Sequence, residues 1–148
     1  MKLSILLKLI RFWPPFLGAG IKVKSFNKDY TELTVQMKIR FWNKNYVGTH
    51  FGGSLYSMTD PFYMLLLLHS LGREYIVWDK SASIRYKKPA RSTVYAQFKL
   101  IPEQIEQIKK ELNDASKIES EFVIEIKDET GDVVAEVKKI LHINKKLK

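Results

Sequence analysis

The stretch SLYSMTDPFYMLLLLHSL, residues 54–71, decides the fold. Its second half contains MLLLL at residues 64–68, and a helix built from these residues is apolar on every face. Such a helix is stable when the rest of the chain encloses it. Gly72 follows directly, and glycine commonly ends a helix. The stretch therefore predicts a central, enclosed helix over residues 54–71.

Alternating apolar and polar residues predict strands on both sides of this helix. Before it, strands are expected over residues 20–26 and 31–42. The second of these has one buried face, made by Leu33, Val35, Met37, Ile39 and Phe41. After the helix, residues 75–86 and 93–101 are expected to form an antiparallel pair around a turn at residues 87–91.

The last third of the chain predicts a helix and a hairpin. Residues 102–114 are polar apart from one helical stripe, which consists of Ile105, Ile108 and Leu112. Residues 118–127 and 133–143 alternate on either side of ETGD at residues 129–132, which is a hairpin signal.

A single curved antiparallel sheet wrapped around the central helix is the economical way to enclose it. The order of elements then predicts an α+β hotdog fold with an extra N-terminal helix, in one domain over residues 1–148. A sheet of this kind has exposed edges, and exposed edges favour pairing with another strand. A homodimer is therefore expected, with a tetramer left open.

The first thirteen residues, MKLSILLKLIRFW, repeat apolar residues at helical spacing. They predict an amphipathic helix that ends at Pro14 and Pro15, and the run is too short to span a bilayer. Two interpretations stay open. The helix packs on its own domain, or it rests on a membrane surface through its basic residues and Trp13. The expected location is cytoplasmic, with a peripheral position at a membrane left open.

The composition limits the partners. Lys and Arg number 25 against 16 Asp and Glu, so the net charge of +9 favours anionic ligands. The absence of cysteine excludes disulfides, thiolate zinc sites and cysteine nucleophiles. The three histidines lack metal-ligand spacing, so no metal is expected. No recognised basic or aromatic RNA-binding motif is present, so no nucleic-acid partner is expected either.

Residues 45–61, NYVGTHFGGSLYSMTDP, carry the candidate chemistry. They resemble the signature of the phenylacetate-type hotdog thioesterases, in which an Asn lies six residues before a His-Gly-Gly triplet and an acid follows on the central helix. Asn45, Gly52, Gly53 and Asp60 occupy those places here. Residues 86–91, YKKPAR, resemble the same family's strand-end segment. The whole pattern is similar to an uncharacterised branch of the superfamily that carries Phe-Gly-Gly and Asp-Pro.

The resemblance implies hydrolysis of acyl-CoA or another acyl thioester in a groove shared by two subunits. Coenzyme A would be part of the substrate, and no separate cofactor is implied. The N–H of Gly53 would bind the thioester oxygen, Asn45 would orient substrate or water, and Asp60 would act as base or nucleophile. The substrate-binding residues would be His50, Phe51, Gly52, Met64, Lys87, Lys88 and Arg91.

Other interpretations of these residues stay open. Asp60 and Pro61 are also a good N-cap and first residue of a helix, so the helix starts there, or it starts near Gly53 and is kinked by Pro61. Asn45 could be a turn residue, and the basic residues around Pro89 could be a solvated turn.

Two departures from the family pattern weaken catalysis more than binding. Phe51 replaces the triplet His, and Met64 stands where some relatives carry a small hydroxyl residue. A non-catalytic hotdog that binds acyl-CoA or lipid is therefore the main alternative. A hydratase or dehydratase is a further one, and it would need His50 to face Asp60.

Overall fold

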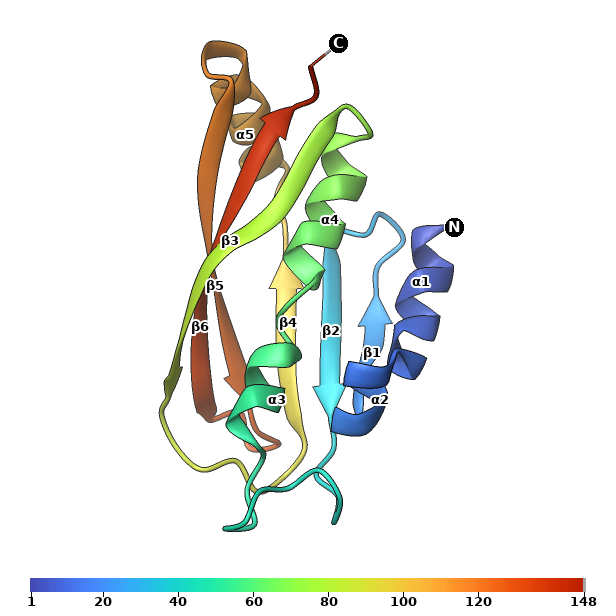
Figure 1. The fold of residues 1–148 in the computed structure, drawn as a ribbon, viewed down its shortest axis with the longest axis vertical. Helices are drawn as coiled ribbons and strands as arrows, with labels where there is room; N and C mark the ends of the chain where they lie inside the picture. Colours follow the sequence, from blue (N-terminus) through green and yellow to red (C-terminus); the bar gives the residue numbers. More distant parts are fainter. Residues whose placement is uncertain (148) are drawn as a thin grey trace.

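Six antiparallel strands form one curved sheet in the computed structural model, which describes residues 1–147 (Figure 1). The strands are β1 (Ile21–Phe26), β2 (Glu32–Met37), β3 (Tyr75–Tyr86), β4 (Val94–Lys99), β5 (Lys117–Lys127) and β6 (Val133–Lys145). Their order across the sheet is β1-β2-β4-β5-β6-β3. The architecture is the α+β hotdog fold that the order of elements predicts.

The central helix lies against one face of the sheet but is broken into two pieces, α3 (Gly52–Ser57) and α4 (Phe62–Leu71) (Figure 1). Of the two alternatives left open by the sequence, the structure therefore supports a helical segment that starts near Gly53 and is interrupted at Pro61. Pro61 has no N–H to donate and its ring obstructs a regular turn. The backbone tightens before it, and the Asp60 N–H donates to Ser57 O (3.1 Å) rather than to a carbonyl four residues back.

The enclosure of α4 is incomplete. Five of its side chains are buried, namely Phe62, Tyr63, Leu66, Leu67 and Leu71. Met64, Leu65 and Leu68 are only half-buried, although they pack against the same core. The sheet supplies the other side of this core through inward-facing residues such as Val35, Ala96 and Val137, which are fully buried.

The N-terminal segment agrees with its prediction up to Pro14 and adds a helix after it. The first helix, α1, covers Leu3–Leu9 and continues as a short 3-10 turn over Ile10–Phe12, so the run ends before Pro14 as expected. Pro14 and Pro15 then begin a second helix, α2 (Pro14–Ala19), which was not predicted. Proline suits the first turn of a helix, where no N–H is needed. Both helices pack beside β1 (Figure 1).

Two strand predictions are corrected. β2 ends at Met37, where the chain leaves the sheet. Phe41 is consequently 83% exposed instead of buried. β3 and β4 do not pair with each other, since β3 pairs with β6 and β4 lies between β2 and β5. The helix α5 (Pro102–Asp114) and the β5–β6 hairpin agree with their predictions.

β3 forms one edge of the sheet. It is 12 residues long, pairs with β6 on one side only, and has a bulge between Asp79 and Ser81. Most of its second half is exposed. β1 forms the other edge, which α1 and α2 flank, so the two edges differ in how well they are covered.

Candidate functional site

A cavity of about 510 Å³ lies where the loop before α3 meets the segment after β3. The loop supplies Asn45, Val47, Thr49, His50 and Phe51, and the start of α3 supplies Gly52, Gly53 and Leu55. The later segment supplies Tyr86, Lys87, Lys88, Pro89, Ala90 and Arg91. The structure therefore brings both sequence motifs to one place, although they are far apart in the chain. Asp60 and Met64 do not line this cavity.

Two backbone N–H groups in this cavity are available to a ligand. Gly52 and Gly53 are the first residues of α3, where an N–H has no acceptor within the helix. Across the described residues, neither N–H donates to any other acceptor. A Cβ on Gly52 would lie 2.9 Å from the Tyr86 hydroxyl, so a larger residue there would displace the Tyr86 ring. The pair can therefore bind a carbonyl oxygen or an oxyanion.

The ring of Phe51 lies over Gly53. A Cβ on Gly53 would lie 2.7 Å from Phe51 Cε1. The ring is also 58% exposed, because Phe51 is the residue before the helix and its side chain has little cover. Phe51 therefore lines the cavity and occupies the space beside Gly53 that a side chain there would need.

Asn45 organises the loop with its own amide. Its Oδ1 accepts from the N–H groups of Val47 (3.1 Å) and Thr49 (3.0 Å), and its Nδ2 donates to Thr49 Oγ1 (2.8 Å). These bonds are typical of an Asn that stabilises a turn. The geometry favours the turn interpretation of Asn45.

His50 connects the two segments that form the cavity. Its N–H donates to Ala90 O (2.9 Å), and its Nε2 donates to Ser92 O (2.8 Å). Burial lowers the pKa of His50, while the bond to the Ser92 carbonyl raises it less. The neutral ring then carries its proton on Nε2, and the buried Nδ1 has no partner among the described residues.

Asp60 lies in the break between α3 and α4. Its carboxylate accepts a hydrogen bond from the Tyr56 hydroxyl (3.3 Å), and 44% of the side chain is exposed. Its side chain makes no capping bond to α4, whose N-cap is Pro61. The capping interpretation is therefore wrong, and the kink at Pro61 is the alternative that the structure supports.

A fully buried lysine lies beneath this break. Lys139 on β6 has no exposed surface, and its Nζ lies 2.9 Å from Asp79 Oδ1 and 3.9 Å from Asp60 Oδ1. The same ammonium group donates to the carbonyl oxygens of Thr59 and Asp60. We call Lys139, Asp79 and Asp60 the inner cluster. Burial raises the pKa of Asp79, the nearby Lys139 lowers it, and the negative charge of Asp60 raises it further.

The inner cluster also acts on Tyr56. Burial raises the pKa of the Tyr56 phenol, and the negative charges of Asp60 and Asp79 raise it further. The phenol therefore keeps its proton and donates it in the bond to Asp60. This bond fixes one carboxylate oxygen of Asp60 and leaves the exposed part of the group free to meet water.

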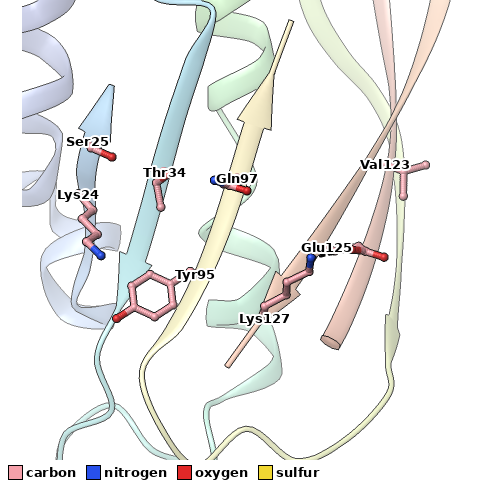
Figure 2. A pocket seen from close by; sticks show the side chains of 8 residues that line it. All are labelled: Lys24, Ser25, Thr34, Tyr95, Gln97, Val123, Glu125 and Lys127. Atoms are coloured by element: carbon pink, nitrogen blue, oxygen red, sulfur yellow. Dashed lines mark ion pairs between the residues drawn. The ribbon is translucent and has the colours of Figure 1, made fainter. Parts of the chain in front are cut away.

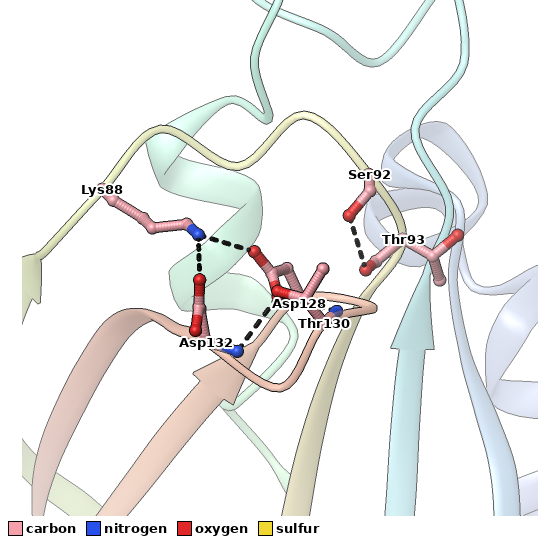
Figure 3. A network of polar contacts seen from close by, with 6 residues as sticks. All are labelled: Lys88, Ser92, Thr93, Asp128, Thr130 and Asp132. Atoms are coloured by element: carbon pink, nitrogen blue, oxygen red, sulfur yellow. Dashed lines mark hydrogen bonds and ion pairs between the residues drawn. The ribbon is translucent and has the colours of Figure 1, made fainter.

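The three basic residues of the strand-end segment have different partners. Figure 3 shows Lys88 between Asp128 (3.0 Å) and Asp132 (2.6 Å) on the β5–β6 turn. Lys87 lies 3.4 Å from Glu136, and Arg91 donates to Val47 O (3.3 Å). Because two carboxylates already neutralise Lys88, Arg91 is the best placed of the three to bind an added anion.

A second hollow, of about 580 Å³, lies on the outer face of the sheet (Figure 2). Its walls are outward-facing side chains of β1, β2, β4 and β5, including Lys24, Tyr95 and Glu125. It is somewhat larger than the first cavity, but neither sequence motif contributes to it. We therefore place the candidate site at the cavity that contains Gly52 and Gly53.

Sequence reasoning missed Lys139 and Asp79. The signal for Lys139 was present, because residue 139 alternates in step with the buried Val137, Leu141 and Ile143. A lysine at such an inward position needs a buried anion. The signal for Asp79 was weaker, since a bulge follows it and disturbs the alternation of β3.

Residues 1–147 lack two further features. No group of three His, Cys, Asp or Glu side chains is arranged to hold a metal ion in this part of the chain. Within the same residues, every helix is too short or too polar to cross a bilayer.

The chain belongs to the family described as a domain of unknown function (DUF4442), whose model matches residues 3–143. No curated protein matches the sequence. Among solved structures, a Pseudomonas aeruginosa protein of unknown function, described as a probable thioesterase, superposes with a TM-score of 0.87 at 20% identity, over 99% of this chain and 97% of that one.

Two further structures share the fold. A thioesterase from Haemophilus influenzae has a TM-score of 0.71 at 15% identity, over 100% of this chain and 94% of its own. A mutant phenylacetic acid degradation protein from Thermus thermophilus has a TM-score of 0.61 at 20% identity, over 87% of this chain and 97% of its own.

Proposed function

We propose that this protein hydrolyses acyl thioesters of coenzyme A in a groove that two copies of the chain complete together. The observation that carries this proposal is the pair of unpaired N–H groups of Gly52 and Gly53 at one cavity with basic residues on its rim. Two of the structures with this fold are described as thioesterases, one of them as probable, which supports the same reaction.

The chemistry assigns one role to each group. The thioester oxygen accepts from the Gly53 N–H, which stabilises the negative charge that forms when water attacks the carbonyl carbon. The Asp60 carboxylate takes the proton of that water. The carbon–sulfur bond then breaks, a carboxylic acid forms, and the coenzyme A thiolate leaves and is protonated. No metal is required for this reaction.

The second copy supplies the missing part of the groove. Asp60 lies outside the cavity of its own chain, and its carboxylate is near β3 because Asp79 on β3 contacts the same lysine. The unpaired edge of β3 can accept an antiparallel strand from another copy. Pairing there extends the sheet and brings Asp60 toward the cavity of the other subunit.

The basic rim suits the phosphates of coenzyme A. Arg91 and Lys87 line the cavity and are only partly engaged, whereas Lys88 is held by two carboxylates. A guanidinium fork binds phosphate oxygens in a fixed geometry. Arg91 is therefore expected to contribute more to coenzyme A binding than Lys88 does.

A non-catalytic protein that binds acyl-CoA is the second candidate, and the position of Phe51 favours it. Its ring lies beside Gly53. The thioesterase signature that this sequence resembles has a histidine at position 51 instead. In this case the cavity binds the thioester without polarising its carbonyl group.

The test compares Asp60→Asn with wild type on acyl-CoAs of increasing chain length, following thiol release. The expected result is a fall in kcat of about a hundredfold or more in the variant, as for loss of a general base. Asp114→Asn, on the exposed end of α5, is the matched control and is expected to keep wild-type rates. Calorimetry with a non-hydrolysable thioether analogue measures binding separately.

Three outcomes decide between the candidates. Turnover that depends on Asp60 supports the hydrolase. Tight binding of the thioether analogue without turnover by wild type supports the non-catalytic protein. Absence of both turnover and binding rejects the acyl-CoA proposal.

A further inference from the structure

Five exposed apolar side chains lie in two segments of the chain, the α1–α2 region and the loop after β2. They are Phe12, Trp13, Leu17, Phe41 and Trp42, and each is at least half exposed. We call this set the aromatic surface. The first three come from the α1–α2 region, and the other two from the loop after β2.

The two segments meet in space. A hollow of about 250 Å³ is lined by Arg11 and Leu17 from the first segment and by Arg40 and Trp42 from the second. Trp42 also shares a hollow of about 390 Å³ with Pro15 of α2. Leu17 and Trp42 therefore line the same hollow, and Phe41 packs on Trp42 with ring centres 5.1 Å apart, although the two segments lie about 25 residues apart in the sequence.

Positive charge surrounds this region. The hollow of about 250 Å³ between the two segments is lined by four cations, Arg11, Lys22, Lys38 and Arg40, and its lining residues include no acid. Arg11 and Arg40 form no ion pair with any described residue. Their guanidinium groups lie 5.4 Å from the ring centres of Phe12 and Trp42 respectively, so each cation is next to an exposed aromatic ring.

We propose that the aromatic surface binds the headgroup layer of an anionic membrane. Trp and Phe are favoured at the boundary between headgroups and acyl chains, and neighbouring Arg and Lys bind anionic lipid phosphates. The charge around the surface has one sign, which complements such lipids. A second copy of this chain would bring like charges together at the same surface and is the less favourable occupant.

The surface also adjoins the candidate site. The hollow shared by Trp42 and Pro15 is lined by Phe51, which lines the cavity of Gly52 and Gly53 as well. If the proposed hydrolysis is correct, a bound membrane presents long-chain acyl thioesters beside that cavity. This part of the inference rests on the proposed function, whereas membrane binding itself does not.

The test is co-sedimentation of the full chain with vesicles of phosphatidylcholine alone and of an equal mixture with phosphatidylglycerol. Wild type is expected to bind the anionic vesicles and to release them at high salt. Arg11→Gln with Arg40→Gln is expected to lower the partition coefficient by about 25-fold, since each charge contributes about fivefold. Phe41→Ser with Trp42→Ser is expected to lower it by about tenfold or more.

Matched controls use residues away from the surface. Lys109→Gln with Lys110→Gln on α5 and Val123→Ser on β5 are expected to bind as wild type. The thermal midpoint of each variant shows whether it is folded. Asp60→Asn is expected to keep full vesicle binding, and Phe41→Ser with Trp42→Ser is expected to keep any turnover of short-chain acyl-CoA, so the two proposals fail separately.

Equal binding to both vesicle types, or no binding by folded wild type, overturns the proposal. A change in molar mass by light scattering in the Phe41→Ser, Trp42→Ser variant overturns it too, because the surface is then an interface between copies.

Discussion

Two lysines in this protein each contact two aspartates, but in opposite environments. Lys139 meets Asp79 and Asp60 with none of its side chain exposed, whereas Lys88 meets Asp128 and Asp132 with 41% of its side chain exposed. The inner cluster joins β3, β6 and the break in the central helix. The outer cluster, Lys88 with its two aspartates, joins a strand end to the β5–β6 turn (Figure 3).

The comparison shows that burial decides how strongly a lysine depends on its carboxylate partners. Moving a charge from water to the interior is costly, so a buried cation requires its partners, whereas an exposed ion pair competes with water and salt. The pKa directions agree with this contrast. Burial raises the pKa of Asp79, whereas hydrogen bonds from Thr130 and Lys88 lower the pKa of Asp128 to about 2.

The largest difference between the two clusters is expected in the free energy of unfolding when each lysine is replaced in turn. Lys139→Met is expected to lower the free energy of unfolding by about 3 kcal/mol, because it leaves a partly buried carboxylate without its cation. Lys88→Met is expected to change it little. Urea denaturation at neutral pH measures both variants. Equal losses would show that burial does not separate the two clusters.

The next largest effect is expected in the pH dependence of stability, which has opposite directions for Asp79 and Asp128. The pKa of Asp79 is raised in the folded state, so its ionisation lowers stability as pH rises from the unfolded value of 3.8 through the folded pKa. The pKa of Asp128 is lowered, so its stabilisation is present above 3.8 and is lost as pH falls toward about 2.

The measurement compares wild type with Asp79→Asn and with Asp128→Asn in urea across the acidic range. Relative to Asp79→Asn, wild type is expected to lose stability as pH rises through this window. Relative to Asp128→Asn, it is expected to lose stability as pH falls. A common direction for both pairs contradicts the assignment.

The smallest effect is expected from salt, which changes how much each cluster contributes to the free energy of unfolding. The exposed outer cluster is screened within about a Debye length, roughly 10 Å at 0.1 M salt. Any stability difference between wild type and Lys88→Met is therefore expected to disappear at high salt. The difference caused by Lys139→Met is expected to persist, and its loss under the same conditions would place Lys139 in contact with solvent.

The elements that the sequence predicted well are those with strong local signals. The alternation of β6 and the turn at Gly131 place the hairpin correctly, because the hydrophobic period and the turn residue agree. The end of β2 and the pairing of β3 were predicted wrongly. Both depend on contacts between distant parts of the chain, which local alternation does not record.

The candidate site was predicted in part for the same reason. The two motifs contain residues that do meet at one cavity, including Gly53 and Arg91. The buried cation was missed, since a lysine in an alternating strand gives no local sign of its partners. The expectation of a groove shared by two subunits came from the family resemblance and stays a prediction.

The ring of Phe51 is 58% exposed beside Gly53, so it can change position quickly. Rotation of an exposed side chain between its rotamers takes picoseconds to nanoseconds, many orders of magnitude faster than a typical enzymatic turnover. If the proposed site binds a thioester oxygen, any cover that this ring gives Gly53 acts as a rapid equilibrium that lowers occupancy without setting the rate. A bulkier or more tightly packed residue at position 51 would convert that equilibrium into a slow gate.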